Sequence, residues 1–209
     1  MTRYIFRLAA ADDRLEVLRL QDQFIAELAD PMGVAEESYE HSEFVLLEAA
    51  DEHRKRAIGI MSLMRASSAP FVCEGVFPDL WQKIDLCVLT GQANIRRDDL
   101  AEGDWGYVEK THRGNGLALL CWAGLMLLAH HRGYPACLGI ANQAALTRMG
   151  SAFHTAGLSS ELSGVRYELG LLLPTQIAPR MAEIVHRAVA RDPNIEWRVP
   201  GLGERPDRS

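Results

Sequence analysis

The sequence predicts an α/β (α+β) fold in which helices cover both faces of a mixed central β-sheet. Apolar periodicity places the elements in the order strand, one or two helices, three strands, helix, strand, helix, strand. A glycine-rich turn separates a strand-like segment from a continuously apolar helix in the second half of the chain. The 209 residues, 48% hydrophobic and 24% charged, suffice for one globular domain with a full core.

The first half of the chain predicts a helical layer and a hairpin of the sheet. A strand is expected at 4–9, and Asp12 with Asp13 is expected to cap a helix that continues to Asp30, because its apolar residues recur with helical spacing. The remaining elements are a short helix at 36–41, strands at 43–50 and 57–65, and a charged turn at 51–56 between these strands.

The second half begins with an insert (residues 66–101), in which a helix is expected near 79–89. The elements expected after it are a strand at 102–108, the apolar helix at 116–132, a strand at 135–141, a helix from Asn142 to Ala156 that Gly157 ends, and a strand at 163–173. We expect the main domain at 1–173. The extension at 174–209 holds an amphipathic helix at 177–190 and a disordered polar tail at 201–209.

The turn at residues 113–118, Arg-Gly-Asn-Gly-Leu-Ala, follows the strand-like segment and opens the apolar helix. A glycine-rich turn at a helix start directs several backbone N–H groups at one point, with the positive end of the helix dipole behind them. This arrangement suits a phosphate or pyrophosphate, and Arg113 adds a charge-assisted contact. We call residues 113–118 the anion cradle. The alternative is a turn that only starts a buried helix.

Two common phosphate-binding motifs do not fit the anion cradle. A Walker A loop requires Lys-Ser/Thr after its second glycine, where this chain has Leu117-Ala118. The dinucleotide-binding fingerprint requires an early position in the domain and an acidic residue about 20 residues further on. Here the turn lies past the middle of the chain, and the next acidic residue after Glu109 is Glu161. A net charge of −6 also argues against a general nucleic-acid-binding surface.

The anion cradle resembles the pyrophosphate loop of the GNAT acyltransferases, Arg/Gln-x-x-Gly-x-Gly/Ala. Arg113, Gly116 and Ala118 occupy its three fixed positions. The order of the elements over residues 3–173 also resembles this family.

A second likeness lies downstream of the anion cradle. Asn142 with Ala145, followed by Phe153 and Gly157, is similar to the family's Asn-x-x-Ala, aromatic, Gly element on the last core helix. The gap between Asn142 and Gly157 is about one helical turn longer than usual.

The resemblance implies a sheet that is splayed at an acyl-thioester site, between the strand before the anion cradle and the next strand. In this family the pantetheine arm of acyl-CoA lies in that gap and pairs with the strand backbone like an extra strand. It therefore implies acyl-CoA (coenzyme A) as co-substrate, without a metal. The residues expected to bind it are Tyr107, Val108, Arg113, Gly114, Asn115, Gly116, Leu117, Ala118, Asn142 and Phe153.

The resemblance also implies attack of an amine on the thioester, with a carboxylate or histidine taking the proton. A backbone N–H of the strand would stabilise the oxyanion. Strand alternation places Glu102, Asp104 and Val108 on one face and Tyr107 on the other. Glu102 occupies the place of the family's general base, and Asp104 lies one step closer to the gap. The alternative is that both carboxylates are merely solvated.

The family's general acid is a tyrosine on the late helix, and alignment on Gly157 places Phe153 there. Phenylalanine cannot donate a proton. His154 is the candidate substitute; otherwise the thiolate leaves unassisted or the activity is weak.

The expected function is a cytoplasmic acyl-CoA-dependent N-acyltransferase with a small-molecule amine acceptor, without nucleic acid or a membrane span, and with a homodimer as an allowed assembly. One alternative is an acyl-carrier-protein-dependent enzyme like the N-acyl amino acid synthases and acyl-homoserine-lactone synthases, which the insert resembles. Its apolar residues would then line an acyl tunnel instead of covering the core, and the basic pairs Lys55-Arg56 and Arg96-Arg97 would meet an acidic carrier. Another is a catalytically idle acyl-CoA-binding domain.

The four cysteines of the chain lack the spacing of metal ligands. We expect them to be reduced thiols in the core.

Overall fold

The computed structural model describes residues 2–28, 40–67, 70–162 and 164–202. The strands are β1 (Arg3–Leu8), β2 (Ser42–Ala50), β3 (Lys55–Arg65), β4 (Ala101–Val108), β5 (Cys137–Asn142), β6 (Phe153–Leu162), β7 (Val165–Leu172) and β8 (Ile195–Trp197). The α-helices are α1 (Arg14–Leu28), α3 (Val72–Val76), α4 (Leu80–Lys83), α5 (Leu86–Thr90), α6 (Leu117–His131), α7 (Gln143–Met149) and α8 (Pro174–Arg191). Short 3₁₀ turns are η1 (Ala11–Asp13), η2 (Arg97–Asp99), η3 (Lys110–His112) and η4 (Gly150–Ala152).

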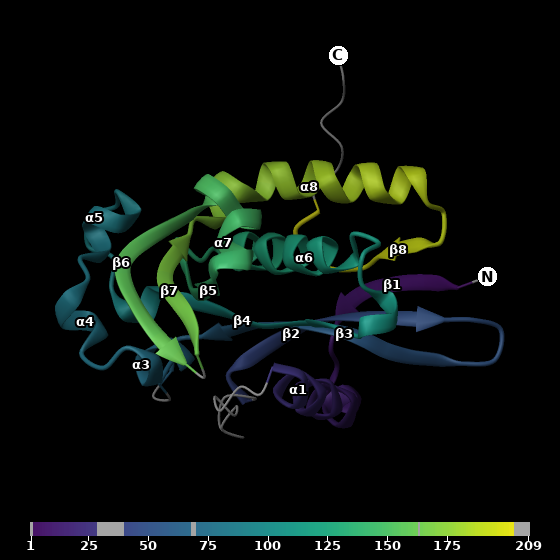
Figure 1. The fold of residues 1–209 in the computed structure, drawn as a ribbon. Coiled ribbons are helices and arrows are strands. Elements are labelled where there is room, and N and C mark those ends of the chain that lie inside the picture. The colour runs from purple at the N-terminus through teal and green to yellow at the C-terminus, as the bar shows by residue number, and fades with distance from the viewer. Residues whose placement is uncertain (1, 29–39, 68–69, 163, 203–209) are drawn as a thin grey trace, which may run out of the picture.

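Within these residues, one eight-stranded sheet runs in the order β6-β7-β5-β4-β3-β2-β1-β8 (Figure 1). The β4–β5 and β1–β8 pairs are parallel, and the other neighbours are antiparallel. Helix α1 packs on β3 and β4 from one face, whereas α6 packs on the opposite face and carries α8 above it (Figure 1). The predicted fold class, a mixed sheet with helices on both faces, is confirmed.

The strands predicted at 4–9, 43–50 and 57–65 and the helix after Asp13 are confirmed in the described residues, with bounds that differ by a few residues. Helix α1 presents apolar side chains to the sheet, where Val17 and Leu20 are fully buried. Strands β2 and β3 form the predicted hairpin around residues 51–54. Of the short helix predicted at 36–41, all but the last two residues lie outside the described part of the chain.

The described residues of the insert form the short helices α3, α4 and α5, and residues 79–89 are divided between the last two, so the prediction of one helix there is wrong. Asp79 has a left-handed φ of 62°, and Ile84 is extended with φ −115° and ψ 145°. The Asp85 side chain then accepts hydrogen bonds from Cys87 N and Val88 N and caps a new helix. These local interruptions prevent one continuous helix, because an Asp side chain satisfies the free N–H groups of a helix start.

The apolar residues of the insert mainly cover the end of the sheet. Phe71 and Phe77 are 1% and 6% exposed and belong to one core cluster with Leu171 of β7. Trp81 and Arg97 both donate hydrogen bonds to the Glu74 carboxylate, and these bonds connect three segments of the insert. Of the two interpretations of the insert, these contacts support the one in which its apolar residues form core.

Helix α6 is apolar around most of its circumference. This composition fits its position, because the sheet covers one side of the helix and α8 covers another. Ten of its residues are buried between the sheet and α8. At Gly124 a Cβ would lie 3.0 Å from Val45 of β2 and 3.4 Å from the Trp197 ring, so a larger residue would push these layers apart. The helix ends before Gly133, whose φ is 78°.

The helix predicted for residues 142–156 is too long, because its second part forms strand β6. The helix predicted to reach Ala156 ends at Met149, since Gly150 has φ 54° and ψ −134°, which no helix continues. Phe153 instead starts β6, which pairs with β7. Its ring packs on Gly170, where a Cβ would lie 2.4 Å from it. The strand thus depends on a contact with β7 that local propensity does not reveal.

Residues 174–202 pack on the same core. Helix α8 is amphipathic as predicted, and its buried side meets α6. Strand β8, which was not predicted, extends the sheet by pairing with β1, and the Trp197 ring stacks on Phe6 at 5.2 Å. Most of the predicted polar tail lies outside the described residues. Across the described ranges, no helix is both long and apolar enough to span a membrane.

Candidate functional site

Strands β4 and β5 are parallel neighbours that separate along their length. They pair only at Ala101 with Cys137 and at Glu102 with Leu138. Beyond these pairs β4 stays with β3, and β5 stays with β7, so the two halves of the sheet diverge. The predicted splay is therefore present in the described strands, with its vertex at residues 101–102 and its open end toward the anion cradle.

A β-bulge in β4 lies within the splayed part. The register against β3 shifts between Asp104 and Tyr107, so that two β4 residues oppose Met61. Before the bulge, Gly103 faces α6, because a Cβ there would lie 2.9 Å from Leu125. The side chains on either side of Gly103 therefore face the α1 layer.

The bulge brings Tyr107 onto the same face as Glu102 and Asp104. The Tyr107 ring meets Phe24 of α1 edge-on at 6.2 Å, whereas Val108 lies in the core beneath α6. The prediction that Val108 shares a face with the two carboxylates is wrong, because strand alternation does not continue through a bulge.

The anion cradle has a backbone that requires glycine. Gly114 and Gly116 have φ values of 91° and 77°. A Cβ on either would meet no heavy atom within 4 Å, so this side of the loop is open. The first hydrogen bond of α6 runs from Leu120 N to Gly116 O at 3.1 Å, and the N–H groups of residues 117–119 have no partner within the helix. This geometry fits a diphosphate group.

Arg113 does not extend into the anion cradle, because its side chain runs back along β4. Its Nε donates to Val108 O at 2.6 Å, and a terminal nitrogen donates to Glu27 of α1 at 2.7 Å. The guanidinium lies 5.3 Å from the centre of the Tyr107 ring. Glu27 also accepts a hydrogen bond from Tyr107 Oη at 2.7 Å. Sequence reasoning missed Glu27, since it lies 86 residues before Arg113 and belongs to no motif.

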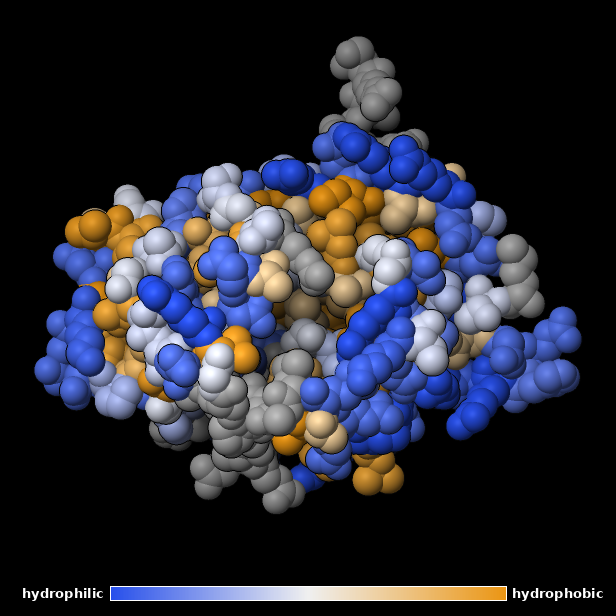
Figure 2. Space-filling view, in the orientation of Figure 1, coloured by the Kyte–Doolittle hydropathy of each residue, from blue (hydrophilic) through white to orange (hydrophobic). Residues whose placement is uncertain are grey.

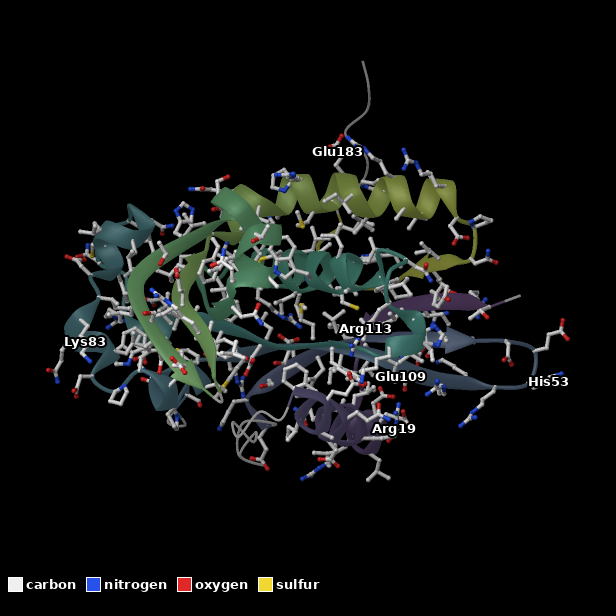
Figure 3. All side chains as sticks on the ribbon, in the orientation of Figure 1. Arg19, His53, Lys83, Glu109, Arg113 and Glu183 are labelled. Carbon is white, nitrogen blue, oxygen red and sulfur yellow. The ribbon has the colours of Figure 1, made fainter. Side chains whose placement is uncertain are left out.

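A second carboxylate, Glu109, fixes the end of β4 to the neighbouring elements. It is 8% exposed and accepts two hydrogen bonds from Arg56 of β3, both at 2.7 Å. Arg19 of α1 donates to it at 3.2 Å and to Ala57 O at 2.6 Å. In Figure 3, the Glu109 label lies between those of Arg113 and Arg19, beside α1. This network positions the backbone that enters the anion cradle.

Glu102 lies at the vertex of the splay, under the start of α3. It is 1% exposed and accepts hydrogen bonds from Val72 N at 2.6 Å and Cys73 N at 2.8 Å. Burial, and next the charge of Asp104, raise the pKa of Glu102 to about 8, although the two N–H groups act in the opposite direction. The alternative interpretation, that this carboxylate is merely solvated, is wrong. Its role as a proton acceptor stays a prediction, as does that of the half-buried Asp104.

Asn142 caps a helix as predicted, because its side chain accepts from Ala145 N at 3.0 Å. Phe153 and His154, however, lie on β6 and not on a late helix. Phe153 is 8% exposed in the core, and His154 pairs with Leu171 of β7. The alignment that placed them at the general-acid position is therefore wrong, because it assumed a helix that continues to Ala156.

The cations proposed for a carrier protein all have carboxylate partners within 4.0 Å. Lys55 pairs with Glu48, Arg56 with Glu109, Arg97 with Glu74, and Arg96 with Asp99. Because these charges are already compensated, they give little support to an acidic partner.

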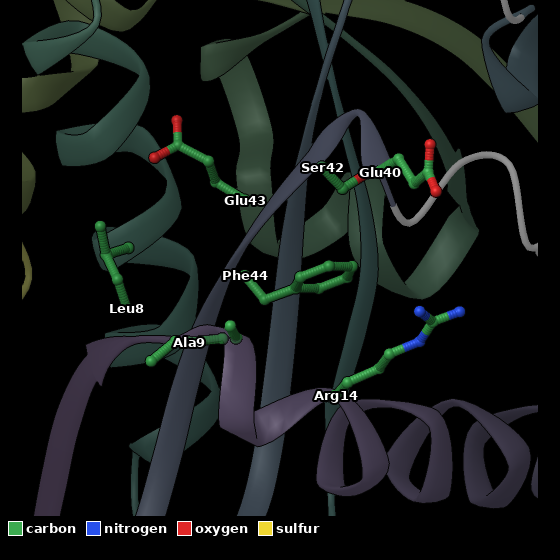
Figure 4. Close-up of a pocket in the computed structure, with 9 residues that line it drawn as sticks. Leu8, Ala9, Arg14, Glu40, Ser42, Glu43 and Phe44 are labelled. Carbon is green, nitrogen blue, oxygen red and sulfur yellow. The ribbon is translucent and has the colours of Figure 1, made fainter.

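A cavity of about 430 Å³ lies elsewhere, between the end of β1 and the start of β2 (Figure 4). Arg14, Glu40 and Phe44 are among its lining residues, and none of the nine belongs to β4, β5 or the anion cradle. The three-residue clusters of His, Cys, Asp or Glu that could hold a metal are absent from the described residues.

Comparison with solved structures identifies the architecture. The structure of BjaI, a CoA-dependent acyl-homoserine lactone synthase with SAM and isopentyl-CoA, matches with a TM-score of 0.63 and 18% identity, covering 96% of this chain and 95% of that one. MesI, another CoA-dependent acyl-homoserine lactone synthase, matches with a TM-score of 0.58 and 17% identity over 88% and 95% of the two chains. FeeM, an N-acyl amino acid synthase from uncultured soil microbes, matches with a TM-score of 0.62 and 13% identity over 88% and 95%.

The chain has the GNAT fold. The predicted GNAT fold is thereby confirmed, and both kinds of enzyme that the insert resembles are among the matches. No protein-family model and no curated protein sequence matches the chain. In this GNAT fold the anion cradle lies at the open end of the splay, and the insert covers its vertex.

Proposed function

We propose that this protein is an N-acyltransferase that moves an acyl group from acyl-CoA to a primary amine by direct attack on the thioester. The observation that carries the proposal is the splay, because β4 leaves β5 after two pairs and opens toward the anion cradle. Free backbone edges in such a gap suit an extended pantetheine arm, and the diphosphate would lie at the α6 N-terminus.

The bulge in β4 supports a role for this strand in the acyl transfer itself. A bulge interrupts the pairing with β3 and leaves a backbone N–H without its ladder partner. An N–H near Gly106 would thus be available to the oxyanion that forms when the amine attacks. The sequence predicts Glu102 and Asp104 as proton acceptors, and both project from the face of β4 that meets the α1 layer.

The main alternative is transfer from an acyl carrier protein to an amino acid. The fold similarity to FeeM, an N-acyl amino acid synthase, supports this alternative. The compensated charges of the four basic residues favour CoA as the donor. A catalytically idle acyl-CoA-binding domain is the third candidate. Cytoplasmic localisation and a homodimer stay predictions.

The decisive experiment replaces Gly116 with valine and measures CoA binding by calorimetry. Val is strained at φ 77° and would place its Cβ on the open side of the anion cradle, so binding should be lost while the fold is kept. Gly75→Val is the matched control, because this helical glycine also has open space around it. Equal CoA affinity in wild type and Gly116→Val would contradict the proposal.

Turnover with a panel of primary amines then separates the three candidates. Acetyl-, octanoyl- and palmitoyl-CoA are compared with the same acyl groups on carrier protein. The proposal expects CoA thioesters to be used at least as well as carrier-linked ones. A strict requirement for the carrier would favour the first alternative, and binding without any turnover would favour the idle domain.

A further inference from the structure

Glu27, in the last turn of α1, places a carboxylate at the open end of the splay. Its two oxygens have different partners: Tyr107 Oη donates to one at 2.7 Å, and Arg113 donates to the other at 2.7 Å. Lys110 Nζ lies 3.8 Å away. The Glu27 side chain is 22% exposed, so a small molecule can reach it from solvent.

The bulge in β4 brings Glu27 close to the splayed strand. Tyr107 directly follows Gly106 within the bulge, and its side chain faces α1. Glu27 is therefore separated from the strand that would hold the thioester by one side chain. Glu102, in contrast, lies at the vertex beneath α3, with both oxygens already accepting backbone N–H groups. Of these two carboxylates, Glu27 is the one that an acceptor can approach.

Arg113 connects Glu27 to the anion cradle. Its guanidinium pairs with Glu27, while its backbone is the first residue of the loop that would hold the diphosphate. The Arg113 side chain is 44% exposed, which leaves it free to turn. A diphosphate in the loop is a stronger attraction for this cation than one partly exposed carboxylate, because it carries more charge and more acceptor oxygens.

We propose that Glu27 accepts the proton of the acceptor's ammonium group, and that the diphosphate of the bound donor frees Glu27 for this step by drawing Arg113 into the anion cradle. The inference rests on the proposed function and names its base. The ammonium group gives one proton to Glu27 and becomes a free amine. The amine nitrogen bonds to the thioester carbon, the C–S bond breaks, and the second nitrogen proton neutralises the departing thiolate. Glu27 then returns its proton to solvent.

The charges around Glu27 are consistent with this role. Its pKa is held below the usual value first by the hydrogen bond from Tyr107 and then by Arg113, with a further contribution from Lys110. When Arg113 leaves, the pKa of Glu27 rises and the carboxylate becomes a better base. Burial and Glu27 itself raise the pKa of Tyr107 to about 12, so its hydroxyl stays a donor and acts as a positioning residue.

The first test needs no acceptor. Calorimetry of CoA binding at pH 5.5, in buffers of different ionisation enthalpy, measures the protons taken up. Wild type should take up more protons than Glu27→Gln, because only wild type gains a carboxylate of raised pKa. Glu27→Gln should also bind CoA about two- to fivefold more tightly at pH 7, since no carboxylate competes for Arg113. Glu16→Gln is the matched control, because Glu16 also pairs with an arginine on α1, and it should behave like wild type.

The second test uses an amine that the wild-type protein acylates. Glu27→Gln should lower turnover about 10²-fold at pH 7, with less loss at high pH, where the amine is already free. Tyr107→Phe keeps Glu27 and should shift the acid limb of the pH–rate profile upward. Glu27→Gln with wild-type proton uptake, CoA affinity and turnover would overturn the inference while leaving the proposed function intact. Wild-type protein that binds no CoA would instead overturn the proposed function, and the inference with it.

Discussion

The two ends of β4 hold carboxylates in opposite ways. At the vertex of the splay, Glu102 is buried and receives backbone N–H groups from α3, and burial raises its pKa to about 8. At the open end, Glu27 and Glu109 each receive arginine side chains. The hydrogen bond from Tyr107, and next Arg113, lower the pKa of Glu27.

This difference shows that the pKa and the partners of a carboxylate near β4 depend on the layer packed over the strand and not on the strand itself. Burial without a cation favours the protonated form, whereas arginine stabilises the charge. The vertex is thus built as a junction between β4 and the insert. The open end keeps charged groups near the anion cradle, where a charged ligand would arrive.

The largest effect is expected from Glu102→Ala, which removes the acceptor for two buried N–H groups. Each unsatisfied group costs about 1–3 kcal/mol, so the free energy of unfolding should fall by about 3 kcal/mol. Urea unfolding measures this change. If the vertex is only a junction, any folded Glu102→Ala protein should still bind CoA with nearly wild-type affinity. A tenfold loss of CoA affinity in folded protein would break the contrast between the two ends.

A smaller loss of stability is expected from Glu109→Ala, at the other end of β4. It should cost about 2 kcal/mol, less than the roughly 3–5 kcal/mol of a fully buried ion pair, because Arg19 and Arg56 remain about one third exposed. Here CoA affinity should fall as well, since the network positions the backbone before the anion cradle. Chemical unfolding and calorimetry on the same samples give both values. Unchanged CoA affinity would show that Glu109 does not position the anion cradle for binding.

The smallest effect depends on pH and concerns Glu102→Gln. Because the pKa of Glu102 is raised in the folded protein, this residue favours folding below its usual pKa of 4.5, and the contribution is lost as the pH rises toward about 8. Glutamine does not titrate, so the Glu102→Gln variant does not lose this contribution to stability as the pH rises. Its stability relative to wild type should increase by at least about 1 kcal/mol between pH 5 and pH 8.

Urea unfolding at several pH values measures this relative change. Glu43→Gln, in the exposed pair of Glu43 with Arg132, is measured in parallel as the control for the substitution itself. Parallel stability curves for wild type and Glu102→Gln would show that the fold does not raise the pKa of Glu102, which would break the contrast with Glu27.

Residues close in sequence predicted most of the elements correctly. The apolar stretches of β2 and β3, the apolar run of α6 and the Asn142 cap are local signals, and each is present in the structure. Strand β6 and the end of α7 were mispredicted, because the ring of Phe153 packs on Gly170, a contact made only when β6 pairs with β7. The same applies to β8, which exists through its pairing with β1.

By itself, the sequence determined the GNAT fold and the anion cradle, since a glycine turn and the helix after it are specified by neighbouring residues. Only the tertiary structure decided which face Tyr107 occupies, because a bulge forms by pairing with another strand. It also decided that Glu102 is covered by α3 and that Glu27 meets Arg113. A charged side chain takes its pKa and its partners from whatever packs against it, and those neighbours lie far away along the chain.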